Sequence, residues 1–102
     1  MTVYQVIISE DAQDDLERLY AFLFDLDPAS ADRAMRVIDK SYGVLARFPH
    51  TCRKAFNGEF GPSTRELLIN FGSSGYLALF EITDAQTVIV LAVRHQRESD
   101  YH

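Results

Sequence analysis

The chain has 102 residues, 47% of them hydrophobic and 25% charged, with a formal net charge of −5 at pH 7. This composition excludes a largely disordered chain and leaves room for a single domain over residues 1–102, while the acidic balance disfavours global nucleic-acid binding, in which phosphate contacts usually dominate. Because Cys52 is the only cysteine and the longest apolar run spans only Val88–Val93, an intramolecular disulfide and a membrane span are also excluded, and we expect a cytoplasmic protein.

A strand and a helix are predicted at the N-terminus. Residues 3–9 (VYQVIIS) are rich in β-branched and aromatic side chains, the composition of a strand. Ser9 is a good N-cap residue, with acidic residues in the first turn after it, where the helix dipole favours negative charge. Apolar residues then recur at steps of three and four and predict an amphipathic helix with this buried stripe: Ala12, Leu16, Leu19, Tyr20, Leu23 and Leu26.

Two features of this helix do not belong to its buried stripe. Phe22 and Phe24 lie off the stripe, so they form either a second packing surface or an exposed patch for a partner. Residues 1–27 hold seven acidic side chains against Arg18 alone, whereas residues 28–102 hold nine basic and eight acidic ones. The acidic face is expected to be an ordinary solvated helix surface.

A second helix and a long loop follow. Asp27-Pro28 indicates an N-cap and a proline at the first helical position, and the helix should end near Phe48-Pro49. With only a turn between them, the two helices should be antiparallel neighbours. Residues 49–63 hold two prolines and two glycines, which predicts a loop.

The C-terminal third predicts three strands. Residues 65–71 and 76–83 form a hairpin around the turn at 72–75, and a second turn at 84–86 leads to residues 87–93, which are apolar at nearly every position and should form a central strand covered on both faces. The predicted class is α+β in the order β-α-α-β-β-β, a helical hairpin packed on a mainly antiparallel four-stranded sheet.

This order, with GSSGYLALFEITD followed by VIVLAVRHQRESDYH, resembles the RelE/ParE family of toxins from type II toxin–antitoxin modules. The most specific parts are Gly75-Tyr76 at the start of the middle strand of the meander and residues 94–98 (RHQRE) after the last strand. The resemblance covers essentially the whole chain. It implies a bacterial protein bound by a cognate antitoxin, whose flexible segment folds over the toxin surface, and no cofactor.

The family divides by activity, and the sequence favours its ParE-like, plasmid-stabilisation branch, whose members inhibit DNA gyrase. RelE-like members cut mRNA on the ribosome, and metal-free RNA cleavage needs a proton acceptor, a proton donor and a cation near the phosphate. RelE-like toxins resemble one another in carrying lysines on the first hairpin strand and an arginine after the Gly-Tyr pair, where this chain has Leu68, Asn70 and Leu77. A RelE-like endoribonuclease and a non-toxic antitoxin-binding module are the alternatives.

Seven residues are predicted to contact the target or the antitoxin. The two phenylalanines are chosen because they lie off the buried stripe, and the others follow from the resemblance to the family: Phe22, Phe24, Arg65, Arg94, His95, Arg97 and Tyr101. Each has a simpler interpretation, such as charged residues leaving a strand for solvent, an arginine protecting a strand edge, or phenylalanines packed under the second helix. No catalytic residue is assigned, because no nucleophile or acid evidently accompanies His95.

Metal binding is not expected, since His50-x-Cys52 with His102 offers only one pair at ligand spacing. The basic stretch from Arg33 to Lys54 and the acidic first helix are suited to a partner with charges of both signs. We expect no sequence-specific nucleic-acid binding and no membrane contact, but self-association of the isolated chain, for example as a homodimer.

Overall fold

Both helices begin where the sequence supplies an N-cap residue. The computed structural model describes residues 3–55 and 60–96, in which α1 spans Glu10–Leu26 and α2 spans Pro28–Arg47. The Ser9 hydroxyl accepts a hydrogen bond from the Ala12 N–H at 3.1 Å, and the Asp27 carboxylate accepts one from the Ala29 N–H at 3.2 Å. Asp27 is the single residue between the helices, so they form a tight hairpin. The predicted ends of both helices are confirmed.

The sheet has five strands rather than the four predicted. They are β1 (Gln5–Ile8), β2 (Arg53–Lys54), β3 (Arg65–Phe71), β4 (Ser74–Asp84) and β5 (Thr87–His95), in the order β1-β5-β4-β3-β2. The pairing of β1 with β5 is parallel, and the other three pairings are antiparallel. The additional strand, β2, lies in the segment predicted as a loop, directly after a short 3₁₀ helix, η1 (Pro49–Thr51). β2 consists of two exposed basic residues, which do not show the alternation of apolar and polar residues typical of a strand. Only their pairing with β3 makes them a strand.

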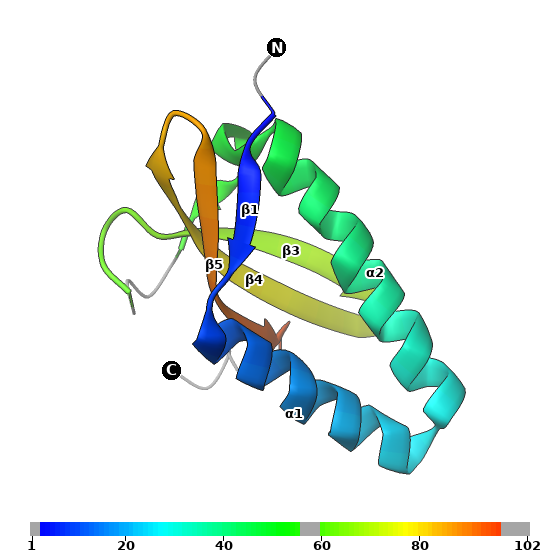
Figure 1. Cartoon of the computed structure of the whole chain (residues 1–102). Coiled ribbons are helices and arrows are strands. Elements are labelled where there is room, and N and C mark those ends of the chain that lie inside the picture. The colour runs from blue at the N-terminus through cyan, green and yellow to red at the C-terminus, as the bar shows by residue number, and fades with distance from the viewer. Residues whose placement is uncertain (1–2, 56–59, 97–102) are drawn as a thin grey trace.

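The helical hairpin covers one face of the sheet, and the core lies between the two layers (Figure 1). Ala12 and Leu19 of α1 and Ile38 and Leu45 of α2 belong to one buried cluster with residues of β4 and β5. The end of the hairpin projects beyond the sheet, so Leu26, predicted to be part of the buried stripe, is 71% exposed. None of the helices in residues 3–55 and 60–96 is long and apolar enough to cross a membrane.

The strand buried on both faces is β4, not β5 as predicted. All six residues from 75 to 80 are buried, because β4 is the middle strand of five. β5 lies inside the sheet as expected, but buried residues along it mostly alternate with half-buried ones. The continuous apolar run of β5 therefore correctly predicted a strand inside the sheet, but it did not predict which strand is buried on both faces.

Two glycines set the β3–β4 hairpin. Gly72 has a φ of 64°, a conformation that glycine adopts without steric cost, in the two-residue turn between Phe71 and Ser74. Gly75 lies inside β4, where a Cβ atom would stand 2.1 Å from the Ile69 carbonyl oxygen. The turn predicted over 72–75 is thus shorter than expected, and the second glycine serves the packing of two strands.

Candidate functional site

The two faces of the sheet carry different side chains. Tyr76, Ala78 and Phe80 of β4 belong to the core beneath the helices, so the alternation along a strand directs Leu77 and Leu79 to the opposite side. We call that side the far face. It also carries their register partners on β3 and β5, which are Glu66, Leu68, Ala92 and Arg94.

A row of three residues crosses the far face. Leu68 pairs with Leu77, and Leu77 pairs with Arg94, in the register of β3, β4 and β5. Leu77 is 5% exposed, whereas Leu68, on the outer side of the row, is 47% exposed. Asn70, exposed two residues beyond Leu68, lies on the same face. Leu68, Asn70 and Leu77, the positions where RelE-like toxins carry cations, therefore lie close together on the far face. Their side chains are two leucines and an amide, none of them charged.

The two charged side chains of the far face, Arg94 and Glu66, each contact another side chain. The Arg94 guanidinium carbon lies 5.9 Å from the centroid of the Phe60 ring, which is within cation–π range. The buried Glu66 carboxylate is 3.1 Å from Nε of Arg53, its register partner on β2. Because an unpaired buried carboxylate is costly, this ion pair accounts for Glu66 on an otherwise apolar part of the sheet.

His95 lies on the helix-covered face, apart from Arg94. Its Nε2 is 3.0 Å from the Ser74 hydroxyl oxygen, and its ring meets the Tyr76 ring edge-on with centroids 5.6 Å apart. Burial raises the pKa of the Tyr76 hydroxyl. A serine beside an imidazole is a nucleophile–base geometry, and the same contact also fixes the ring at the strand end. Sequence reasoning missed Ser74, which only the register of the short hairpin brings to His95.

Arg65 contacts the backbone of the segment after α2. Its guanidinium donates to the Cys52 carbonyl oxygen at 2.6 Å and to the His50 carbonyl oxygen at 3.4 Å. These bonds connect the start of β3 to η1, which is a structural task. The thiol of the buried Cys52 has its pKa raised by burial, which disfavours the reactive thiolate.

The phenylalanines off the buried stripe of α1 are exposed. Phe22 is 64% and Phe24 47% exposed, and the Phe24 ring contacts the Tyr20 ring with centroids 5.8 Å apart. These exposed fractions contradict the interpretation that both phenylalanines are packed under the second helix. Phe24 and Tyr20 share one side of α1, whereas Phe22 and Leu26 share another.

The predicted contact residues therefore do not form one site. Arg94 lies on the far face, His95 on the other face, Arg65 at the start of β3, and the phenylalanines near the end of the helical hairpin. Arg97 and Tyr101 lie outside the described residues, as does His102. Within residues 3–55 and 60–96, no three His, Cys, Asp or Glu side chains are grouped so as to hold a metal ion.

Comparison with known proteins relates this fold to toxins. Residues 6–100 match the family model described as the ParE toxin of the type II toxin–antitoxin system, parDE. Toxin RelE1 of Caulobacter vibrioides is 30% identical over 78% of this chain and 80% of its own length. Toxin RelE3 of the same organism is 29% identical over 85% and 88%, respectively.

Two solved structures are similar in fold. A chain of the chromosomal ParDE toxin–antitoxin system of P. aeruginosa has a TM-score of 0.74 at 17% identity, covering 91% of this chain and 96% of that one. A chain of the RelBE2 toxin–antitoxin complex of Mycobacterium tuberculosis has a TM-score of 0.61 at 26% identity, covering 93% and 100%.

The helical hairpin on a mixed sheet and these matches define the class of protein, a toxin of the RelE/ParE superfamily. Within that superfamily, the chain belongs to the ParE toxin family of type II toxin–antitoxin systems.

Proposed function

We propose that this toxin acts in the bacterial cytoplasm by inhibiting DNA gyrase through protein–protein contact, and that a cognate antitoxin neutralises it. The observation that supports this most is the row of Leu68, Leu77 and Arg94 on the far face. At the positions where RelE-like toxins carry cations, the exposed Leu68 suits apolar protein contact, and neither Leu68 nor the buried Leu77 offers a charge to a phosphate.

The chemistry of RNA cleavage sharpens this argument. A phosphorane gathers negative charge, and losing one preorganised donor to such an oxyanion typically costs about 3–4 kcal/mol of transition-state stabilisation. Leu68 and Leu77 supply no donor, and Arg94 is engaged with Phe60. The far face therefore lacks much of what a RelE-like mechanism needs.

A supercoiling assay tests the proposal directly. The chain is expressed without its antitoxin, purified and added to DNA gyrase with relaxed plasmid. We expect loss of supercoiling and, in cells, a DNA-damage response before translation stops. Undiminished supercoiling at micromolar toxin contradicts the gyrase assignment, and the same toxin preincubated with antitoxin is the control.

The endoribonuclease remains the second candidate because the curated relatives are named RelE toxins. Primer extension on translated messages after induction distinguishes the two activities. We expect no new cuts at codon positions, and fresh cuts in the ribosome-bound frame would replace the gyrase proposal with the ribonuclease.

The end of β5 is the proposed target contact. The Arg94/His95/Arg97→Ala triple variant is expected to fold normally, because Arg94 and His95 are only half-buried. It should lose toxicity, because it removes the side chains proposed to contact the target. Single variants then separate the far face (Arg94→Ala) from the helix-covered face (His95→Ala). Full toxicity of the triple variant at an unchanged melting temperature rules this contact out.

A further inference from the structure

Four basic side chains lie on one side of α2. Arg33, Arg36, Lys40 and Arg47 follow one another at intervals of three, four and seven residues, which brings them onto one side of an α-helix. All four are exposed, on the side of α2 opposite its buried residues. We call these four residues the basic stripe. At the helical rise of about 1.5 Å per residue, it extends for about 21 Å.

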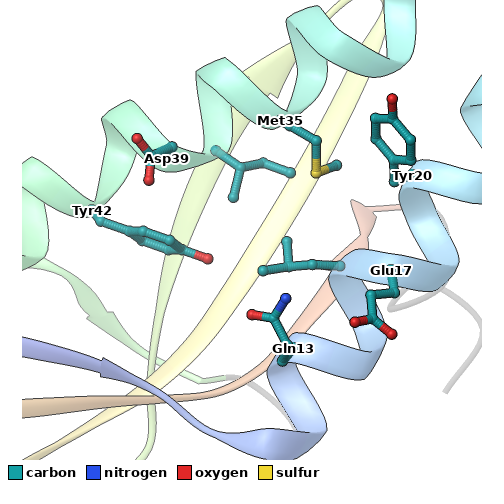
Figure 2. Close-up of a pocket in the computed structure, with 8 residues that line it drawn as sticks. Gln13, Glu17, Tyr20, Met35, Asp39 and Tyr42 are labelled. Carbon is teal, nitrogen blue, oxygen red and sulfur yellow. The ribbon is translucent and has the colours of Figure 1, made fainter. Parts of the chain in front are cut away.

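The two carboxylates of α2 face α1 instead. Asp32 accepts a hydrogen bond from the Tyr20 hydroxyl of α1 at 3.0 Å. Asp39 lines a groove between the two helices, together with Glu17 of α1 and Tyr42 (Figure 2). Burial of the Tyr42 hydroxyl, together with the nearby Asp39 carboxylate, raises the pKa of that hydroxyl to about 12. The acidic and basic side chains of α2 are therefore separated on its surface.

The charges of the basic stripe are not compensated in the described part of the chain. None of the four side chains forms an ion pair within residues 3–55 and 60–96, and Arg33 donates to the uncharged Ser30 hydroxyl at 2.8 Å. Arg36 and Lys40 are four residues apart, a spacing at which like charges destabilise a helix. A helix face that is merely solvated more often mixes both signs. The stripe therefore indicates an anionic partner.

We propose that the basic stripe of α2 binds the phosphate backbone of duplex DNA without regard to base sequence. This inference rests on the proposed function in one respect, since gyrase supplies the DNA where the toxin acts. Duplex DNA carries one negative charge per about 1.7 Å of its axis, so a stripe about 21 Å long can contact several phosphates. Arginine and lysine donate to phosphate oxygens and position a protein on DNA without reading its sequence.

The composition of the stripe favours phosphate over an acidic segment of another protein. Protein interfaces depend on buried aromatic and apolar anchors, and lysine is depleted in them. Within residues 33–47, all of which the structure describes, Val44 is the one exposed large hydrophobic residue. The stripe thus offers charge and little apolar surface.

The location of the stripe suits a toxin that meets DNA on its target. The helical hairpin covers one face of the sheet, and the stripe lies on the outer side of that hairpin, so the stripe and the far face are on opposite sides of the molecule (Figure 1). Contact of the far face with gyrase therefore leaves the stripe accessible to DNA that gyrase holds. The acidic α1 beside the stripe opposes binding to DNA alone, which should be weak and sensitive to salt.

Fluorescence anisotropy of a labelled DNA duplex tests the stripe with the toxin alone. The variant Arg36→Gln/Lys40→Gln is compared with Arg18→Gln/Lys54→Gln, which removes two positive charges at exposed positions of α1 and β2. At low salt we expect Kd to rise about tenfold for the stripe variant and less than about threefold for the control. The slope of log K against log salt concentration, about −3.6 for four phosphate contacts, should become about −1.8 in the stripe variant and stay unchanged in the control.

Each outcome separates this inference from the proposed function. If about 100 μM toxin does not bind the duplex at low salt, or if the two variants bind alike, the stripe is not a DNA contact, while gyrase inhibition still stands on the supercoiling assay. If the stripe binds DNA but supercoiling is undiminished, the inference holds and the gyrase proposal fails.

Two further measurements exclude other partners of the stripe. Weaker binding of the stripe variant to the protein encoded by the adjoining gene, with DNA binding unchanged, makes the stripe a protein contact and contradicts the inference. Tighter binding of the unaltered toxin to duplex RNA than to duplex DNA assigns the stripe to RNA instead. We expect neither result.

Discussion

Gly75 of β4 lies opposite Asn70, where the backbone of β3 leaves no room for a side chain. A Cβ atom there would stand 2.1 Å from the Ile69 carbonyl oxygen, and a backbone atom cannot move aside as a flexible side chain can. We therefore expect Gly75→Ala to destabilise the fold by about 3 kcal/mol, at the upper end of overpacking effects. Urea unfolding of purified protein measures the change.

Gly43 is the matched control for that substitution. It lies in α2, where an added Cβ would meet no atom within 4 Å beyond its chain neighbours and the adjoining backbone of its own helix. Alanine there should raise stability by about 0.5–1 kcal/mol, because glycine loses more chain entropy in a helix. A Gly75→Ala protein as stable as Gly43→Ala would show that β3 and β4 do not approach as closely as described.

Tyr42 links stability to alkaline pH. Its pKa is raised to about 12 in the folded chain, above the ordinary value of 10.0, so the unfolded chain loses this proton first. Stability is therefore fully present below pH 10 and falls as the pH rises toward 12. Tyr42→Phe should change stability at pH 7 by less than about 0.5 kcal/mol, since the hydroxyl has no hydrogen-bond partner in the part of the chain that the structure describes. The substitution should also weaken the alkaline decline.

Chemical denaturation at pH 7 and at several values above 10 measures both effects. Other tyrosines also titrate in that range, so the difference between Tyr42→Phe and the unaltered chain is the quantity that matters. Parallel declines of the two proteins would mean that Tyr42 is not desolvated in solution.

At the scale of elements, Asp15 joins α1 to the sheet. Its carboxylate accepts a hydrogen bond from the Val93 N–H at 3.0 Å, on a part of β5 beyond the residues paired with β1. Asp15→Ala leaves that buried N–H without its acceptor and should cost about 1–3 kcal/mol. Asp15→Asn, whose amide oxygen still accepts, should cost less.

Asp14→Ala serves as the control on the exposed neighbouring position of the same helix. It should change the free energy of unfolding by less than about 0.5 kcal/mol. If both alanine variants unfold at the same urea concentration, the Asp15 contact makes no net contribution.

Elements whose signals are local were predicted well. Ser9 and Asp27-Pro28 are short sequence signals that indicate where the two helices begin, and Gly72 indicates the hairpin turn. β2 was missed because Arg53 and Lys54 become a strand only through β3. Leu26 continues the apolar stripe of α1 although the sheet ends before it, and sequence periodicity does not report where a neighbouring layer stops.

The candidate site was predicted less well for the same physical reason. The row of Leu68, Leu77 and Arg94 needs the register of three strands, which shifts by one residue with every error in turn length. The contact between Ser74 and His95 depends on the same register. The groove between the helices requires knowing which sides of α1 and α2 face each other.

On the scale of the whole molecule, the end of the helical hairpin extends beyond the sheet and exposes large apolar side chains. Phe22 and Leu26, 64% and 71% exposed, lie one turn apart on one side of α1. Phe22→Ser/Leu26→Ser should leave the melting temperature within about 3 °C and reduce self-association at high concentration. Light scattering and thermal melts measure the two responses.

Leu19→Ser provides the contrast, because Leu19 is buried in the core of the same helix and its replacement should unfold the chain. A fall in melting temperature of more than about 8 °C, which for a domain of this size means a loss of more than about 1 kcal/mol, would show that Phe22 and Leu26 pack in the core.

The parallel pairing of β1 with β5 also limits how early the newly synthesised toxin can complete its sheet. Gln5 to Ile8 are synthesised 82 residues before their partners, Thr87 to Val90. Contacts so distant along the chain form late, because the intervening chain must first be ordered. Until Thr87 to Val90 have emerged from the ribosome, α1 and β1 lack the strand that they pack on, so the sheet can close only after β5 is made. An antitoxin already present in the cell then meets each new toxin molecule as it folds.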